Sequence, residues 1–192
     1  MSTRQALRRR VPARKATYRD VLNAPAHMVA EVVEGALHLQ PRPASPHALA
    51  GSSLGDELVS PFQKGRGGPG GWWILDEPEL HFGEDILVPD LAGWRRERMP
   101  DYPDVPYFTL APDWVCEILS PSTRKIDLEG KRPVYAREGV NYLWFVDPEA
   151  RTLEAFALEG RSWAPAGAAR ESEPVSLPPF DAVSFPLDTL WP

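Results

Sequence analysis

The chain has 192 residues, of which 43% are hydrophobic, and carries a formal net charge of −6 at pH 7. This length suits one domain with a sizeable core, and no apolar run is long enough to span a membrane. A single cysteine, Cys116, excludes an internal disulfide framework. Because no apolar leader segment stands near the N-terminus, we expect a protein of the reducing cytoplasm.

The charge is distributed unevenly along the chain. Residues 1–15 hold six basic residues and no acidic one, whereas the rest has 15 basic against 27 acidic residues, a net charge of −12. We expect residues 1–16 to form a mobile basic arm, which is either a solvated tail or an arm that contacts phosphate groups. The acidic body would not bind nucleic acid tightly through bulk charge alone.

Apolar periodicity predicts helices and strands in alternation through the first half of the chain. A short helix at 17–23 precedes a hairpin that turns at Glu34 and Gly35, and a longer helix starts at Ser45. The glycine-rich loop at 64–71 lacks the Gly-Lys-Ser/Thr ending of a nucleotide-binding loop. Three strands in a meander are predicted next, at residues 72–75, 79–82 and 86–94.

The second half begins with a proline-rich loop and a strand at 114–119, after which Ser120 to Thr123 can cap a helix. Pro133 implies that this helix is kinked, or starts late with Pro133 in its first turn. Two further strands are predicted at 142–146 and 152–156. The proline-rich segment from Pro174 to Pro192 is expected to wrap the surface, anchored by Leu177, Phe180, Phe185, Leu187 and Trp191. The fold class is therefore α/β (α+β), a mixed sheet flanked by helices in one domain at 17–192.

Two acidic residues stand in apolar strand-like surroundings. In an alternating reading, Trp114, Cys116 and Ile118 share one face of a strand, and Glu117 lies on the other face with apolar neighbours. Asp90 lies inside the predicted strand at 86–94. Because a buried, unpaired carboxylate costs several kcal/mol, these acids should face a cation, each other across a metal, or a polar cleft.

The acids indicate a reaction class when a lysine lies near them. Mg²⁺ prefers oxygen ligands, so one or two carboxylates and a substrate phosphate suffice to hold it. Such a metal activates water, and a lysine stabilises the added negative charge. This pattern favours phosphodiester hydrolysis over glycoside hydrolysis, which needs two acids but no lysine. No zinc-binding spacing of histidines or cysteines occurs in the sequence.

Several segments together resemble a known family. The resemblance is to the Uma-type (Uma-two) family of bacterial restriction-endonuclease-like proteins, within the PD-(D/E)XK nuclease superfamily, and it covers roughly residues 17–190. Its most specific part is the block from Glu117 to Thr123. The segments that carry it are Ala30–Leu37, Val88–Ala92, Glu117–Thr123, Asp127, Lys131, Tyr135, Gly139-Val140 and Tyr142–Pro148.

The resemblance implies a restriction-endonuclease-like fold and a Mg²⁺-dependent (or Mn²⁺-dependent) endonuclease site. By position, Asp90 and Glu117 match the metal-ligating motif acids, and Glu31 matches an early acid that serves as a third ligand or orients water. The superfamily's motif lysine would fall at Leu119, so the motif is broken there. Lys131 on the following helix is the matching lysine, with Lys125 as the reserve candidate.

Each site residue also has a structural interpretation. Asp90 could cap a turn, and Glu117 could form a structural ion pair with Arg95, Arg124 or Lys125. Glu31 could face solvent, and Lys131 could be a solvated helix residue. Two functions follow from these choices. One is an active endonuclease on nucleic acid, with DNA expected, and the other is a catalytically silent nucleic-acid-binding or accessory protein. The resemblance also implies a homodimer that reaches both strands, and the sequence leaves the oligomeric state open.

Overall fold

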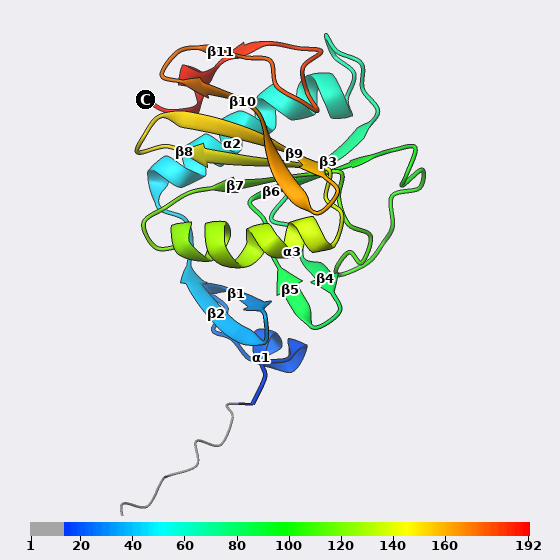
Figure 1. The fold of residues 1–192 in the computed structure, drawn as a ribbon, viewed down its shortest axis with the longest axis vertical. Helices are drawn as coiled ribbons and strands as arrows, with labels where there is room; N and C mark the ends of the chain where they lie inside the picture. The colour runs from blue at the N-terminus through cyan, green and yellow to red at the C-terminus, as the bar shows by residue number, and fades with distance from the viewer. Residues whose placement is uncertain (1–13) are drawn as a thin grey trace, which may run out of the picture.

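The structure is a computed structural model that describes residues 14–192 (Figure 1). At its centre lies a six-stranded mixed sheet with the strand order β10-β9-β8-β7-β6-β3. In this sheet β7 runs parallel to β8, and the other neighbouring strands are antiparallel. The strands are β3 (Trp72–Asp76), β6 (Leu91–Arg95), β7 (Trp114–Ile118), β8 (Tyr142–Asp147), β9 (Thr152–Glu159) and β10 (Ser162–Arg170).

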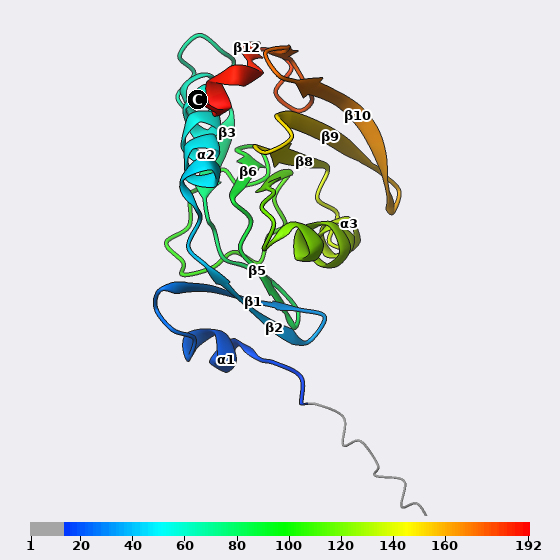
Figure 2. The same ribbon diagram turned by 90° about the vertical axis from the view of Figure 1, so that its left-hand side faces the viewer.

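Helices cover both faces of this sheet. The helix α2 (Ser45–Leu58), extended by a π-helical turn η1 (Val59–Gln63), lies on one face, and a second helix lies on the other (Figure 2). The second helix joins β7 to β8, which run parallel and so need a crossover connection. It consists of a π-helical turn η2 (Ile126–Lys131) followed by α3 (Arg132–Arg137). The predicted alternation in β7 is confirmed, because Cys116 packs in the core beneath α2, whereas Val115 packs in the core beneath α3.

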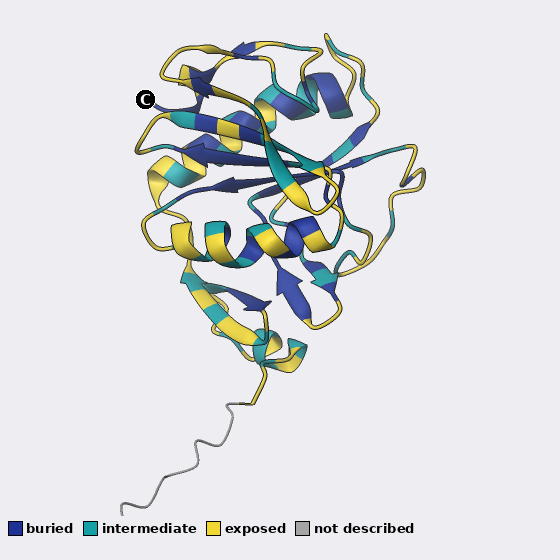
Figure 3. Cartoon of the chain, in the orientation of Figure 1, coloured by how far each residue is buried: buried dark blue, intermediate teal, exposed yellow. Residues whose placement is uncertain are grey.

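A smaller, four-stranded sheet has the order β2-β1-β5-β4. The predicted hairpin is confirmed, with Glu34 at φ 51° and Gly35 at φ 79° forming its turn. Its inner strand is buried toward the turn, whereas its outer strand lies at an exposed edge (Figure 3). The predicted first helix is also present and is capped by Thr17 and Asp20. These elements are α1 (Tyr18–Leu22), β1 (Met28–Val33), β2 (Ala36–Pro41), β4 (Leu80–Phe82) and β5 (Asp85–Leu87).

The predicted three-stranded meander is wrong. The segment 86–94 is two strands, because β5 ends at Leu87 and β6 starts at Leu91. β5 pairs with β1 and β4 in the small sheet, whereas β6 pairs with β3 and β7 in the large one. Pro89 lies in the break and has no backbone N–H to donate to a sheet. Asp90 therefore lies in the connection between the two sheets and not inside a strand.

The C-terminal third contains three strands that the sequence pattern did not predict. β10 pairs with β9 along its length and carries an irregularity between Pro165 and Gly167. Beyond it the chain covers α2, and the expected anchors Phe180, Phe185 and Leu187 are buried in the core beneath that helix. The last elements are β11 (Pro174–Val175), β12 (Phe185–Pro186) and η3 (Leu187–Leu190).

The arm predicted at residues 1–16 falls largely on residues 1–13, which lie outside the described residues. Arg14 forms an ion pair with Asp20 at 2.7 Å, and Lys15 forms one with Glu84 at 2.7 Å. Residues 14–16 thus contact the first helix and the small sheet. In the described part of the chain, no helix has both the length and the apolar character needed to cross a membrane.

Two glycines of α2 should respond differently to alanine. A Cβ on Gly51 would lie 3.2 Å from Ile118 Cδ1, whereas a Cβ on Gly55 would meet no atom of residues 14–192 within 4 Å. Gly55→Ala should raise the free energy of unfolding by about 0.5–1 kcal/mol, because alanine restricts the unfolded chain and favours helix. Gly51→Ala should raise the free energy of unfolding by less, because the methyl group of the alanine would crowd Ile118 on β7. Urea denaturation measures both, and equal gains would contradict the close packing at Gly51.

Candidate active site

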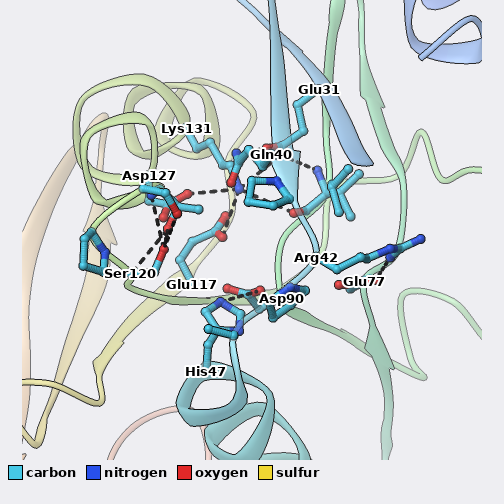
Figure 4. Close-up of a pocket in the computed structure, with 18 residues that line it drawn as sticks. Glu31, Gln40, Arg42, His47, Glu77, Asp90, Glu117, Ser120, Asp127 and Lys131 are labelled. Carbon is cyan, nitrogen blue, oxygen red and sulfur yellow. Dashed lines mark hydrogen bonds and ion pairs between the residues drawn. The ribbon is translucent and has the colours of Figure 1, made fainter. Parts of the chain in front are cut away.

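A cleft of about 260 Å³ opens near the junction of the two sheets (Figure 4). It lies beside the end of β7, and its walls are the segment after β2, the loop that follows β7 and the start of η2. The acidic and basic side chains that line it are Glu31, Arg42, His47, Glu77, Asp90, Glu117, Asp127 and Lys131.

Asp90 ties the start of β6 to the end of β7. Its Oδ2 accepts a hydrogen bond of 2.6 Å from the backbone N–H of Ile118. Its Oδ1 lies 3.2 Å from Nε2 of His47, which α2 presents from its first turn. The side chain of Asp90 is 20% exposed, so solvent reaches it, whereas the side chains of Glu31 and Glu117 are each 1% exposed.

Glu117 lies on β7 and faces the helix η2-α3. Its side chain is 1% exposed. Oε1 accepts a hydrogen bond of 2.5 Å from Tyr135 Oη, and Oε2 accepts one of 3.1 Å from Lys131 Nζ. Both oxygens of Glu117 are therefore held in fixed positions beneath the helix.

Glu31 reaches the same place from the small sheet. It is buried on β1, and its Oε1 accepts a hydrogen bond of 2.8 Å from the backbone N–H of Val88. Its Oε2 accepts one of 2.8 Å from Gln40 on the neighbouring strand. Since Oε1 also lies 3.1 Å from Lys131 Nζ, Glu31 links the small sheet to the helix on the large sheet.

Lys131 stands at the centre of these acids (Figure 4). Its Nζ lies 3.1 Å from a carboxylate oxygen of each of three residues, Glu31, Glu117 and Asp127. Lys131 ends the π-helical turn, and Pro133 follows in the first turn of α3. The late start predicted for this helix is wrong, because helical backbone already begins at Arg124 and the π-helical turn directly precedes the proline. We call Lys131 and its three carboxylates the lysine cage.

A family model identifies the chain's relatives. Residues 17–188 match the model of the Uma2 family, described as "Putative restriction endonuclease". The chain belongs to the Uma2 family. A solved structure titled as a "putative nuclease belonging to DUF820", from Anabaena variabilis, has 22% sequence identity and a TM-score of 0.72. That likeness covers 91% of this chain and 97% of the other, and it shows a shared fold. A search of curated proteins gives no match.

In this Uma2 chain the four predicted site residues, Asp90, Glu117, Glu31 and Lys131, all line one cleft. Glu117 contacts none of the basic residues proposed as its structural partners in the sequence, and Glu31 is buried instead of facing solvent. Lys125, the reserve lysine, is exposed on the helix.

Three neighbours of the site were not predicted to have a role in it. Asp127 and Tyr135 lie four residues before and after Lys131, a helical spacing that could have identified both. Gln40 comes from a separate strand, and no spacing along the sequence indicates its contact with Glu31.

The Uma2 cleft holds more negative than positive charge. Burial raises the pKa of Glu31, Glu117 and Asp127, and the other carboxylates nearby raise it further, although Lys131 opposes both effects. Burial alone would lower the pKa of Lys131, but the three carboxylates outweigh burial and raise it well above its usual value. Lys131 is therefore charged, and its cage has two carboxylates in excess when all three are ionised.

This charge excess predicts a pH dependence of stability. The three carboxyls have raised pKa values in the folded protein, so they bind protons more tightly there than in the unfolded chain. The stability they contribute is complete below their ordinary pKa values, about 4, and falls as the pH rises toward neutrality. Urea denaturation between pH 4.5 and 8 should show this fall, and Glu117→Gln should reduce its slope. An unchanged slope would contradict the buried charge excess.

The lysine cage also decides how a metal would be held. Among residues 14–192, no three His, Cys, Asp or Glu side chains are arranged as a ready-made metal site, and the ammonium of Lys131 stands between the carboxylates instead. The donors are nevertheless the oxygen ligands that Mg²⁺ and Mn²⁺ prefer. Within the same described residues, the buried Asp127 Oδ1 accepts no hydrogen bond. The residues therefore fit a hard divalent cation in donor chemistry and in charge.

Proposed function

We propose that this Uma2 protein is a metal-dependent endonuclease that hydrolyses phosphodiester bonds in nucleic acid, with DNA as the expected substrate. The observation that carries the proposal is the convergence of Asp90, Glu117 and Lys131 on one cleft in which buried carboxylates outnumber the cation. The family and the shared fold support a nuclease-like protein. A homodimer would present two such clefts to the two strands of a duplex.

Asp90 and Glu117 are the proposed ligands of Mg²⁺ or Mn²⁺. A bound cation of this kind polarises a phosphoryl oxygen and lowers the pKa of a coordinated water molecule. The backbone N–H of Ile118 fixes Asp90 through Oδ2, and Oδ1, which lies 3.2 Å from Nε2 of His47, is the oxygen proposed to bind the cation. Tyr135 fixes Glu117 through Oε1, which leaves Oε2 on the side of Lys131.

Lys131 and Glu31 supply the remaining roles in the proposal. The ammonium of Lys131 lines the cleft, where its positive charge can offset the negative charge that develops on phosphate oxygens. The resemblance implied that Glu31 is a third metal ligand or a water-orienting group. Because Oε1 of Glu31 accepts from the backbone N–H of Val88 and lies 3.1 Å from Lys131 Nζ, we propose instead that Glu31 holds Lys131 in place.

A second candidate is a catalytically silent nucleic-acid-binding or accessory protein. The observation that favours it is the lysine cage itself, since Lys131 contacts three carboxylates and so completes a buried ionic cluster without any ligand. Such clusters also occur where they serve only the fold. The two candidates differ in whether the protein turns over substrate.

Asp90→Asn separates the two functions. Asparagine keeps an oxygen for the Ile118 N–H but removes the charge that a cation needs. Wild type should cut a supercoiled plasmid, single-stranded DNA or RNA in the presence of Mg²⁺ or Mn²⁺ and stop on addition of a chelator. Asp90→Asn should slow cleavage at least about 100-fold, and Glu129→Gln, an exposed acid on the following helix, should leave it unchanged.

Two other outcomes are informative. Equal cleavage by Asp90→Asn and wild type would overturn the assignment of this site. Metal-independent retention of nucleic acid with no cleavage by wild type would favour the silent protein.

A further inference from the structure

Lys131 has more acceptors around it than it has N–H groups to donate. An ammonium group carries three N–H donors. Around Nζ lie the carboxylate oxygens of Glu31, Glu117 and Asp127, each at 3.1 Å, and the backbone carbonyl of Val88 at 3.4 Å. The geometry of a hydrogen bond is met toward Glu117 and Val88. The ammonium is thus shared among acceptors that compete for it.

Asp127 is the acceptor left over in this competition. Its side chain is 2% exposed, and its Oδ1 accepts no hydrogen bond from the described residues although Lys131 Nζ is 3.1 Å away. The two residues are four apart on the same helix, so the backbone holds their separation fixed. A buried carboxylate oxygen without a hydrogen bond is costly, and the nearby ammonium is the donor that can remove this cost.

We propose that Asp127 is a positioning residue for Lys131, the acceptor to which the ammonium turns when Glu117 binds a divalent cation. This inference rests on the proposed function of the site. A cation on Glu117 would compete with the ammonium for Oε2 and repel it, because the two carry charges of the same sign. Glu31 and Asp127 are the carboxylates that then keep Lys131 inside the cleft.

Of these two carboxylates, Asp127 is the one that can accept a further hydrogen bond. Glu31 Oε1 already accepts from Val88 and Oε2 from Gln40, whereas Asp127 Oδ1 is free of hydrogen bonds within residues 14–192. Asp127 therefore acts on the cation through Lys131, without binding it.

A double-mutant cycle tests this indirect action. Mn²⁺ affinity is measured by calorimetry for wild type, Asp127→Asn, Lys131→Met and the double variant. With Lys131 present, Asp127→Asn should weaken Mn²⁺ binding about tenfold, the range seen when partners of metal ligands are removed. In the Lys131→Met background, Asp127→Asn should lower the Mn²⁺ affinity by no more than about twofold. Glu129→Gln removes an acid from the exposed face of the same helix and controls for its charge.

The outcomes distinguish this inference from the proposed function. Equal losses of affinity in the two backgrounds overturn the positioning role, because Asp127 then acts on the cation directly. If neither wild type nor Lys131→Met binds Mn²⁺, the metal-dependent site and this inference are overturned together. A larger loss with Lys131 present supports the inference.

A spectroscopic measurement on the wild-type protein serves if Lys131→Met does not fold. The protein is labelled with ¹⁵N at lysine Nζ, and the Lys131 signal is identified by its absence in Lys131→Arg. Saturating Mg²⁺ should shift this signal in wild type, and in Asp127→Asn it should broaden as the ammonium exchanges with water. A signal that stays unmoved by Mg²⁺ in wild type overturns the proposal.

Discussion

Glu117→Gln should abolish Mn²⁺ binding and leave the protein at least as stable as wild type at neutral pH. Removing one partner of a buried ion pair usually destabilises a protein, because the other charge is left without compensation. Here Lys131 keeps Glu31 and Asp127 at 3.1 Å, and the change removes one of the excess carboxylates. Glutamine also retains an oxygen that can accept the hydrogen bond from Tyr135. We expect the free energy of unfolding to rise by about 1 kcal/mol.

Two measurements on the same preparation check this expectation. Calorimetry gives the heat of Mn²⁺ binding, and urea denaturation at pH 7.5 without metal gives the free energy of unfolding. Loss of binding together with a loss of several kcal/mol of stability would mean that Glu117 is needed mainly for the fold. Binding that persists in Glu117→Gln would remove Glu117 from the proposed ligands.

Lys131→Met should have the opposite effect on stability. Methionine preserves much of the apolar stem of the side chain but leaves three buried carboxylates without a cation. An uncompensated buried charge costs about 3–5 kcal/mol, so the variant should be strongly destabilised at neutral pH. Part of this loss should be recovered toward pH 5, because the carboxyls then take up protons. Urea denaturation at both pH values measures the loss and the recovery.

Lys125→Met is the matched control for this change. Lys125 is exposed on the same connection, so its replacement should alter stability by no more than about 0.5 kcal/mol. A similar small effect for Lys131→Met would show that the three carboxylates are already protonated in the folded protein at neutral pH.

The sequence predicted the strand that carries Glu117 because its pattern is local. Successive side chains of β7 point to opposite faces of the sheet, a pattern that consecutive residues show, and the adjoining Ser-Pro-Ser-Thr block marks where the strand ends. The lysine cage is only partly local. The spacing of Asp127, Lys131 and Tyr135 is visible in the sequence, but the contacts of Lys131 with Glu31 and of Glu31 with Gln40 depend on how the two sheets meet.

The errors have a common physical cause. The run from Ile86 to Trp94 is apolar on both sides of Asp90, so periodicity could not show that its halves pair in different sheets. Pro89 was the available signal. β10 is rich in alanine and contains Pro165, so it shows no alternation of its own. It forms because β9 offers a complete set of backbone partners.

The backbone of Val88 joins the two sheets and so links the stability of the fold to the binding of a cation in the cleft. Its N–H bonds to Glu31 on the small sheet, while its carbonyl accepts from Lys131 on the helix of the large one. Fluctuations that move the β1–β2 hairpin away from the large sheet must therefore separate Glu31 from Lys131. By linkage, whatever stabilises the closed charge cluster lowers the population of the opened hairpin. Amide exchange in the hairpin would thus report the state of the charge cluster in the cleft.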